Sequence, residues 1–306
     1  MFNKIVVVGP IFIKKDCVDE LKKYCKKLEV YDTPANGEKE IIKRINDADC
    51  ILVSTNTLIN KTVINNCLNI KHVELCCSYF GKEYSKVDID ALEGKGITYS
   101  YLSEYGDNGV VEYTVAQTIN LIQGLNGKML KQIPYDLTGI KIGIIGLGNL
   151  GYKIAKAFRL FETDLYYYSR TRKEKIEQEL GIKYLNLDEL LKTVDIISIN
   201  VNRDVCLIGG EKLSDFNNNK AIINTSIGKC YEIESLKKWL DNKSNYYICD
   251  KPSINEKDIK KIINYDNVIY TDQHSGGSTK QCLERATKQI IDNLKKALAN
   301  INKSNE

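Results

Sequence analysis

Short apolar runs alternate with amphipathic segments along the first third of the chain. The apolar runs predict strands at residues 5–8, 28–31, 51–54, 73–76 and 97–101. Between them, apolar residues recur at the spacing of a helix face, which predicts helices at 18–24, 38–45, 61–67 and 88–92. Because strands that alternate with helices form βαβ units, we expect a parallel sheet covered by helices in this region.

A second alternating series begins at Ile140. A predicted helix at 110–125 and a turn-rich stretch at 134–139 precede it, and the latter suits a boundary. The series predicts strands at 142–145, 165–168, 196–201, 221–225, 246–249 and 268–270, and helices at 150–161, 187–193 and 233–240. A last helix is expected from Ser278-Thr279, whose hydroxyls suit a helix N-cap, to about residue 300.

The two series predict an α/β protein with two doubly wound parallel sheets, each of the Rossmann or flavodoxin-like type. The chain has 306 residues and is 43% hydrophobic, which is enough for two domains of ordinary size. We also expect a cofactor cleft between the two domains.

Charge and cysteine usage narrow the function classes. A net charge of +4 from 44 basic and 40 acidic residues is too balanced for a nucleic-acid surface, so we expect no nucleic-acid partner. Ten cysteines occur without a CxxC pair, so we expect no metal site and reduced, mostly buried thiols. No apolar run approaches the ~20 residues that span a bilayer, and the run at 5–8 is too short for a secretory signal. A cytoplasmic protein without a membrane partner is therefore expected.

The candidate chemistry begins at the sequence GLGNLG, residues 146–151. An apolar strand leads into it and an amphipathic helix leaves it, which is the context of a dinucleotide-binding turn rather than of a plain glycine-rich turn. Gly146 permits the tight turn, Gly148 lets the backbone approach a pyrophosphate, and Gly151 lets the helix pack close to the strand. The helix N-terminus then offers its amides and its positive dipole end to the phosphates.

The following strand predicts which dinucleotide binds. An NAD site usually has Asp or Glu at the end of this strand, where the carboxylate binds the ribose hydroxyls. Here the strand 165–168 is followed by Ser169, Arg170 and Thr171, so the acid is missing. Two hydroxyls and a planar guanidinium suit a 2′-phosphate, so we predict NADP, with NAD as the alternative cofactor.

Five stretches of the chain carry a family resemblance. They lie at 110–112, 167–173, 223–226, 266–268 and 274–279. Together they resemble the D-isomer-specific 2-hydroxyacid dehydrogenases, and the second stretch is similar to the glyoxylate/hydroxypyruvate reductase branch, which favours NADP. The resemblance covers nearly the whole chain.

The resemblance implies a domain arrangement and a set of contact residues. The substrate domain would be discontinuous, 1–108 plus 276–306, and the segment 109–275 would bind NAD(P). The implied cofactor contacts are Gly146, Gly148, Asn149, Leu150, Gly151, Ser169, Arg170, Thr171, Asn202, Thr225, Ser226 and Asp250. The implied substrate contacts are Thr55, Asn56, Tyr79, Phe80, Gly81 and Ile227.

The family's chemistry uses a histidine, a glutamate and an arginine, of which only the histidine is matched here. His274 falls at the position of the proton donor, a task that suits an imidazole near neutral pH. Asn255 stands where the family has its glutamate, and Glu256, one residue on, is the candidate replacement. Ile227 stands where the family has the arginine that holds the substrate's carboxylate, so Lys251 is the nearest candidate cation.

We therefore expect an NADPH-dependent oxidoreductase that reduces a 2-oxoacid or a related small carbonyl compound to the 2-hydroxy compound. Two alternatives stay open because the arginine is absent: a non-catalytic NADP-binding sensor or partner-binding protein, and a reductase whose substrate has no carboxylate. The segment 112–146 is shorter than in the family, and 127–132 is too short for the arm that embraces a second subunit. A homodimer with a shortened dimerisation arm stays open as well.

Overall fold

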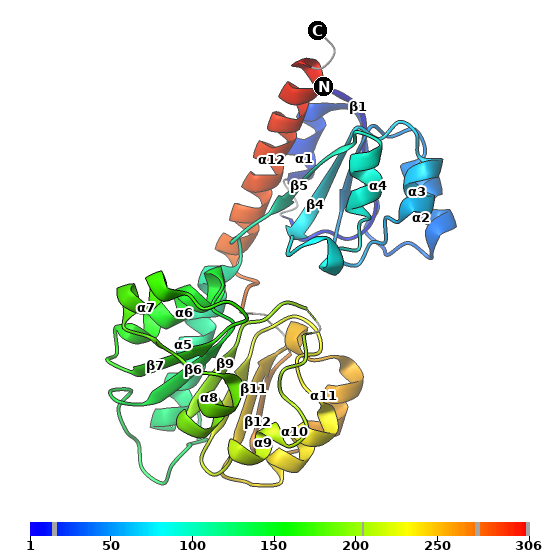
Figure 1. Ribbon diagram of the computed structural model, residues 1–306. Helices are drawn as coiled ribbons and strands as arrows, with labels where there is room; N and C mark the ends of the chain where they lie inside the picture. Colours follow the sequence, from blue (N-terminus) through cyan, green and yellow to red (C-terminus); the bar gives the residue numbers. More distant parts are fainter. Residues whose placement is uncertain (14–16, 204, 273–275, 304–306) are drawn as a thin grey trace. The chain divides into compact units, whose positions relative to one another are not determined.

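The computed structural model describes residues 1–13, 17–203, 205–272 and 276–303. The chain forms two compact units (Figure 1). Unit 1 comprises Met1–Tyr105 with Thr279–Glu306, and unit 2 comprises Gly106–Ser278. Each unit is a parallel sheet with helices on both faces, so the predicted class of two parallel-sheet α/β domains is confirmed.

Unit 1 contains a five-stranded sheet in the order β2-β1-β3-β4-β5, and all neighbouring strands are parallel. Its strands are β1 (Phe2–Val7), β2 (Cys25–Val30), β3 (Cys50–Val53), β4 (His72–Ser78) and β5 (Thr98–Leu102). Its helices are α1 (Cys17–Leu21), η1 (Lys22–Tyr24), α2 (Glu38–Ile45), α3 (Lys61–Asn66), η2 (Lys82–Tyr84), α4 (Ile89–Gly94) and α12 (Lys280–Lys303). One face of the sheet packs against α1 and α12, and the other against α2, α3 and α4 (Figure 1).

Burial on both faces explains the continuous apolar runs that predicted β1, β3 and β4. All four residues of β3 are buried. Ile51 and Val53 belong to the core under α2, α3 and α4, whereas Cys50 and Leu52 belong to the core under α1 and α12. A strand covered on both sides needs apolar residues at every position, so it shows no alternation with polar residues.

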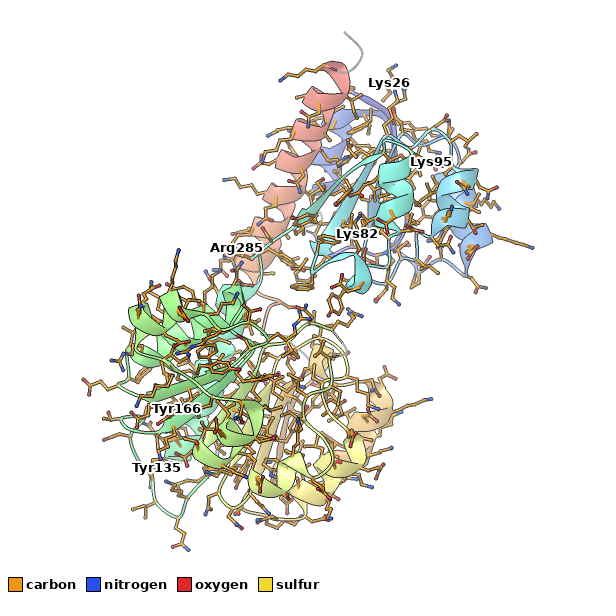
Figure 2. The ribbon with its side chains drawn as sticks, viewed as in Figure 1. Lys26, Lys82, Lys95, Tyr135, Tyr166 and Arg285 are labelled. Carbon is orange, nitrogen blue, oxygen red and sulfur yellow. The ribbon has the colours of Figure 1, made fainter. Side chains whose placement is uncertain are left out.

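The last helix, α12, returns to unit 1 and is attached there by polar contacts. The Thr279 hydroxyl accepts a hydrogen bond from the Cys282 backbone N–H at 3.1 Å, which confirms the predicted N-cap. One turn further on, Arg285 Nε donates to the Tyr105 carbonyl at 2.8 Å (Figure 2). The contact of Arg285 joins the terminal helix to the segment that leaves β5.

Unit 2 contains a seven-stranded sheet in the order β12-β11-β10-β9-β6-β7-β8, again parallel throughout. Its strands are β6 (Lys141–Ile145), β7 (Asp164–Tyr168), β8 (Lys183–Tyr184), β9 (Ile196–Ile199), β10 (Ala221–Asn224), β11 (Tyr246–Asp250) and β12 (Val268–Thr271). Its helices are α5 (Asp107–Gln123), α6 (Asn149–Arg159), α7 (Glu174–Leu180), α8 (Leu187–Thr193), α9 (Lys212–Asp215), α10 (Ile233–Leu240), η3 (Lys251–Ser253) and α11 (Glu256–Ile262). One core lies under α5, α6 and α7, and the other lies under α8, α9, α10 and α11.

Five elements of unit 2 were not predicted: α7, β8, α9, η3 and α11. Leu180 is the buried residue of α7 and Leu213 that of α9, so neither helix shows a clear apolar face in the sequence. The start of α11 depends on Asn255, whose side chain accepts a hydrogen bond from the Asp258 backbone N–H at 3.0 Å. The predicted strands 196–201 and 221–225 also end early, at the last residues of β9 and β10.

The cysteines agree with the prediction from composition. All of them except Cys206 are buried, which confirms the prediction of mostly buried thiols. Over the ranges that the structure describes, no helix combines the length and the apolar character needed to cross a membrane.

Candidate cofactor site

The sheet order of unit 2 creates a change of direction at β6. The chain runs outward from β6 to β7 and β8, and it then returns to β9, which lies on the other side of β6. In a parallel sheet the carboxyl ends of such neighbours form a crevice in which ligands bind. Four adjacent strands end at this edge, and Gly146, Asn200, Thr225 and Asp250 stand at or directly after the ends of β6, β9, β10 and β11.

Two glycines of the turn after β6 are required by packing. Gly146 has a φ of +93°, and a Cβ there would lie 2.1 Å from the Asn200 carbonyl oxygen. A Cβ on Gly151 would lie 2.1 Å from the Gly146 carbonyl oxygen. Any larger residue at either position would therefore force the backbones apart, so these glycines let β6, β9 and α6 approach closely.

Gly148 differs from its two neighbours in the motif. It is the N-cap residue of α6, with φ −84° and ψ −163°, and no side chain caps the helix there. A Cβ on Gly148 would meet no atom within 4 Å. The space in front of the helix N-terminus and the uncapped amides behind it fit the phosphates of a dinucleotide.

Buried polar atoms without partners lie along the same edge. Among the described residues, Asn200 Oδ1, Thr225 Oγ1 and Asp250 Oδ1 are buried and accept or donate no hydrogen bond. Buried polar atoms are nearly always paired, because an unpaired one costs about 1–3 kcal/mol. Three such atoms on three neighbouring strand ends fit a polar ligand along the crevice.

Asp250 is fixed at the end of β11. Its Oδ2 accepts a hydrogen bond from the Gly276 backbone N–H at 2.9 Å, and its own carbonyl accepts one from the Ser253 hydroxyl at 2.8 Å. Burial raises the pKa of the Asp250 carboxyl, although the contacts with Gly276 and Ser253 act in the opposite direction. The second carboxyl oxygen, Oδ1, is left buried without a hydrogen-bond partner among the described residues.

Ser226, another predicted cofactor contact, joins two strand ends. Its hydroxyl donates to the Ile199 carbonyl and accepts from the Val201 backbone N–H, both at 2.9 Å. The side chain is buried, so it holds the loops after β9 and β10 together. Asn202, which directly follows Val201, is half-buried, and its carbonyl accepts from the Val205 backbone N–H at 3.3 Å.

The two arginines in the loop after β7, Arg170 and Arg172, differ in their contacts. Arg172 makes a bidentate pair with Glu177, at 2.9 and 2.8 Å. This pairing, together with the Tyr167 hydroxyl, lowers the pKa of Glu177 to about 2. Arg170 is exposed and makes no hydrogen bond or ion pair with any residue in the described part of the chain.

The two hydroxyl residues of the same loop, Ser169 and Thr171, stand on either side of Arg170 in the chain. The Ser169 hydroxyl donates to the Thr171 carbonyl at 2.5 Å, which folds the start of the loop back on itself. Ser169 is half-buried, and Thr171 is exposed beside Arg170. Of the two arginines in this loop, Arg170 is therefore the one that is available to a ligand.

The predicted catalytic residues differ in how far the structure defines them. His274 lies outside the described residues. Lys251 and Glu256 are exposed, and Ile227 is 44% exposed. The Gly228 backbone N–H donates to the Pro252 carbonyl at 3.4 Å, so the loops that carry Ile227 and Lys251 lie side by side.

Asn255 has a structural task that its sequence position did not reveal. Besides accepting the capping hydrogen bond, its Nδ2 donates to Asp258 Oδ2 at 2.8 Å. Both side-chain atoms are thus engaged at the start of α11. Glu256 is the first residue of that helix, and its carboxylate is the one closest in sequence to Asn255.

The predicted substrate contacts of unit 1 follow the ends of β3 and β4. Thr55 and Asn56 lie in a turn in which the Thr57 backbone N–H donates to the Ser54 carbonyl at 3.2 Å. These loops stand at the carboxyl edge of their own sheet, as ligand-binding loops of open parallel sheets do.

The loop after β4 is built around an aromatic side chain. The Tyr79 ring packs against Tyr101 and Tyr99, with centroid distances of 5.0 and 6.1 Å. Phe80 is 55% exposed, and Gly81 has a φ of +124°. Phe80 is therefore largely exposed beside a tyrosine that packs against two others.

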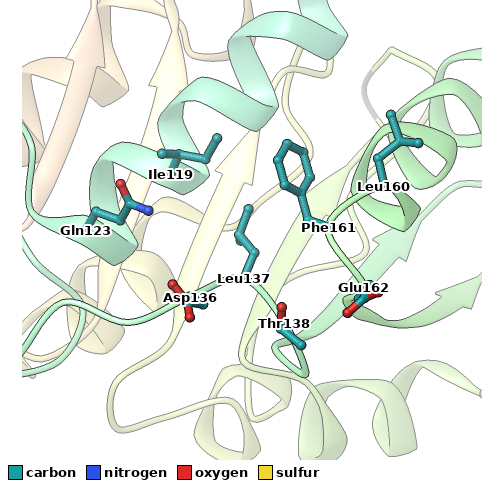
Figure 3. Close-up of a pocket in the computed structure, with 8 residues that line it drawn as sticks. All are labelled: Ile119, Gln123, Asp136, Leu137, Thr138, Leu160, Phe161 and Glu162. Atoms are coloured by element: carbon teal, nitrogen blue, oxygen red, sulfur yellow. The ribbon is translucent and has the colours of Figure 1, made fainter.

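A separate cavity of about 290 Å³ lies at the opposite edge of unit 2 (Figure 3). It is lined by the carboxyl-terminal ends of α5 and α6 and by the segment before β6, namely Ile119, Gln123, Asp136, Leu137, Thr138, Leu160, Phe161 and Glu162. The glycine turn is at the amino-terminal end of α6, so this cavity is not part of the cofactor site.

The middle and end of the chain match one protein family. Residues 116–276 match the family model described as the NAD-binding domain of D-isomer-specific 2-hydroxyacid dehydrogenases. This chain belongs to that family. The predicted resemblance is confirmed, and the family consists of oxidoreductases that act on CH–OH groups with a nicotinamide cofactor.

Relatives and solved structures extend the similarity over most of the chain. A glyoxylate reductase of Pyrococcus horikoshii is 26% identical over 293 residues, which cover 87% of this chain and 85% of that protein. The D-lactate dehydrogenase from Aquifex aeolicus, complexed with NAD and lactic acid, has a TM-score of 0.77 at 22% identity and covers 97% of this chain and 96% of its own. An acyclic imino acid reductase in complex with NADPH and D-Arg has a TM-score of 0.78 at 22% identity and covers 97% of both chains.

Because one structural neighbour holds NAD and the other NADPH, the choice of cofactor has to be argued from the residues of this chain.

Sequence reasoning missed one residue of the site, Asn200. A polar residue directly after a buried strand was its available indication, but the strand was predicted to run on to residue 201. The contact of Asn200 with Gly146 depends on strand order, which local patterns do not specify.

Proposed function

We propose that this protein uses NADPH to reduce a 2-oxoacid, or a related small carbonyl compound, to the corresponding 2-hydroxy compound. The observation that carries the proposal is the row of ligand-ready groups along the carboxyl edge of unit 2. It consists of the open face of Gly148 and the unpartnered oxygens of Asn200, Thr225 and Asp250. The nicotinamide dinucleotide of the family is a ligand of the length and polarity that such a row requires.

The preference for NADPH rests on the loop after β7. Arg170 is exposed and unpaired among the described residues, and no carboxylate stands beside it at the end of the strand. Arg172 is already neutralised by Glu177. A guanidinium without a partner attracts a 2′-phosphate, and the hydroxyls of Ser169 and Thr171 lie next to it in the chain.

We assign the chemistry to a small set of residues. The nicotinamide, when bound, supplies the hydride that reduces the carbonyl carbon. His274 donates the proton that the carbonyl oxygen takes up, so that the C=O group becomes CH–OH and the imidazole is left neutral. Glu256 stabilises the protonated histidine, and Lys251 holds the carboxylate of an acidic substrate in place of the absent arginine.

The two domains, each built on one of the sheets, have different proposed roles. Segment 109–275 binds the cofactor, and the segments 1–108 and 276–306 contribute Thr55, Asn56, Tyr79, Phe80 and Gly81 to substrate binding.

We also propose a homodimer with a shortened arm. It is supported by three exposed apolar side chains of unit 2, Leu125, Ile133 and Leu160, which are 66%, 72% and 83% exposed. Leu160 also lines the cavity of Figure 3.

A second candidate function is a non-catalytic NADP-binding sensor. The exposed aliphatic side chain of Ile227, at the position where the family has its substrate-holding arginine, favours it. In this case the cofactor site would be kept and the substrate site lost. A reductase whose substrate has no carboxylate would explain the same residue as an apolar pocket wall.

Oxidation of NADPH in the presence of a panel of carbonyl compounds distinguishes the three hypotheses. The panel contains glyoxylate, pyruvate and hydroxypyruvate, together with aldehydes and ketones of matched size that lack a carboxylate. Turnover of the acids supports the proposed function, and turnover of the uncharged compounds alone supports the apolar pocket. Tight NADPH binding without any turnover supports the sensor.

A further inference from the structure

The loop that follows β9 begins directly against the glycine turn. A Cβ built on Gly146 would lie 2.1 Å from the Asn200 carbonyl oxygen and 3.4 Å from Val201 Cγ1. The Val201 backbone N–H donates to the Ser226 hydroxyl at 2.9 Å, so the start of the loop is also fixed to the segment after β10. The loop therefore leaves the sheet beside the turn that fits the phosphates of a dinucleotide.

A half-buried arginine stands in this loop. Arg203 directly follows Asn202, whose carbonyl accepts a hydrogen bond from the Val205 backbone N–H at 3.3 Å, so the chain turns at Arg203. The Arg203 guanidinium makes no hydrogen bond, ion pair or ring contact with any residue that the structure describes. A charged group that loses water without gaining a partner costs free energy, and an anion beside it would offset that cost.

The other five arginines of the chain do not combine half-burial with the lack of a partner. Three of them donate hydrogen bonds to carboxylates or carbonyls, and the remaining two are exposed, so water hydrates them. The hydrogen-bonded ones are Arg44, Arg172 and Arg285, and the two exposed ones are Arg159 and Arg170.

The glycine turn has no cation of its own. Neither the sequence GLGNLG nor the first turn of α6, residues 149–152, contains Lys or Arg. Lys153, the next residue of the helix, pairs with Asp107 at 2.9 Å. The amides and the dipole of α6 supply only partial positive charge, whereas both phosphates of a pyrophosphate carry negative charge. A neighbouring guanidinium would complete the charge balance.

We propose that Arg203 binds the pyrophosphate of the nicotinamide dinucleotide. A planar guanidinium can donate two parallel hydrogen bonds to a phosphate, and the loop that carries Arg203 starts against the glycine turn. Strands β7 and β9 flank β6 on opposite sides, so Arg170 and Arg203 follow strands on opposite sides of that turn. Arg203 thus serves the part that NADPH and NADH share, and Arg170 the 2′-phosphate. The role of Arg203 requires the dinucleotide site, but neither a preference for NADPH nor a particular substrate.

Arg203→Ala should weaken the binding of both dinucleotides equally. We expect the dissociation constants for NADPH and for NADH each to rise by about 10- to 100-fold, the size expected for a lost hydrogen bond to a charged group. Arg203→Lys keeps the charge without the planar fork, so it should lose less affinity than the alanine variant. Fluorescence titration of both dinucleotides at one salt concentration measures these constants.

Two fragments of the cofactor separate the roles of the two arginines. ADP-ribose contains the pyrophosphate and lacks the 2′-phosphate, whereas adenosine 2′-monophosphate contains the 2′-phosphate and lacks the pyrophosphate. In titration calorimetry, Arg203→Ala should weaken the binding of ADP-ribose alone, and Arg170→Ala that of adenosine 2′-monophosphate alone. A wild type that prefers NADH removes the proposed NADPH preference, while NADH and ADP-ribose still decide the role of Arg203.

Arg159→Ala is the matched control. Arg159 is exposed at the carboxyl-terminal end of α6, the end opposite to the glycine turn, and its loss should change neither dissociation constant. The melting temperature of ligand-free Arg203→Ala should equal that of the wild type, because no described residue loses a partner. A fixed concentration of NADH or NADPH should raise that temperature less than in the wild type.

Three results would overturn the role of Arg203. The first is an unchanged affinity of Arg203→Ala for both dinucleotides. The second is a loss confined to NADPH, which would place Arg203 at the 2′-phosphate instead. The third is an unchanged dinucleotide affinity with a raised KM for an acidic substrate, which would place Arg203 at the substrate's carboxylate.

Discussion

Replacement of Gly148 by alanine separates cofactor binding from folding. The three glycines of the turn differ in what a methyl group would meet. At Gly146 and Gly151 it would lie 2.1 Å from a backbone oxygen, so alanine there should destabilise unit 2 by roughly 3 kcal/mol or more. At Gly148 it would meet nothing within 4 Å, and the backbone angles are ones that alanine adopts readily.

The magnitude follows from the role assigned to the open space. The methyl group of Gly148→Ala would occupy the position in front of the α6 N-terminus that the pyrophosphate is proposed to approach. Loss of one charge-assisted hydrogen bond costs roughly 1.5–3 kcal/mol, so the dissociation constant for NADPH should rise by about 10- to 150-fold. The stability cost is that of a weaker N-cap residue, about 1 kcal/mol or less.

Fluorescence titration with NADPH and thermal unfolding measure the two quantities on the same sample. Gly94→Ala is the matched control, because a methyl group on Gly94 in α4 also meets nothing within 4 Å. It should leave NADPH affinity unchanged. If Gly148→Ala folds normally and binds NADPH as tightly as the wild type, the turn does not hold the pyrophosphate and the fit described above is wrong.

Three further predictions concern the loops around this turn. Arg170→Ala should weaken NADPH binding by about 10- to 100-fold and leave NADH binding unchanged. Arg172→Ala removes an arginine already paired with Glu177 and should have a smaller effect in the same titration. A wild type that prefers NADH would contradict the assignment. Lys251→Ala should raise KM for an acidic substrate by the equivalent of roughly 1.5–3 kcal/mol, and Ile227→Arg should improve glyoxylate or pyruvate reduction; steady-state kinetics that do not respond to the loss of Lys251 exclude it from the site. His274→Ala should lower kcat by about 10²- to 10⁴-fold with NADPH binding nearly unchanged, whereas full turnover would assign the proton to another group.

The helices with a strong apolar face could be predicted to the residue. The predicted ranges 38–45, 187–193 and 233–240 coincide with α2, α8 and α10. In α10 the buried residues Ile233, Leu236, Trp239 and Leu240 repeat at helical spacing, so the sequence alone marks the helix. The helices that were missed bury few side chains, and their formation depends on contacts with the rest of unit 2.

The sequence by itself determined the parallel α/β class and the glycine turn that marks a nicotinamide-dinucleotide domain, because each depends on residues close together in the chain. Tertiary structure alone decided why Gly146 must be glycine, since the obstructing carbonyl belongs to Asn200 on a strand that the sheet order places beside β6. It alone also joined Tyr113 to Thr271 and Asp250 to Gly276. Local hydrophobic periodicity specifies which face of an element is buried, but the contacts between elements depend on the order in which the strands pair.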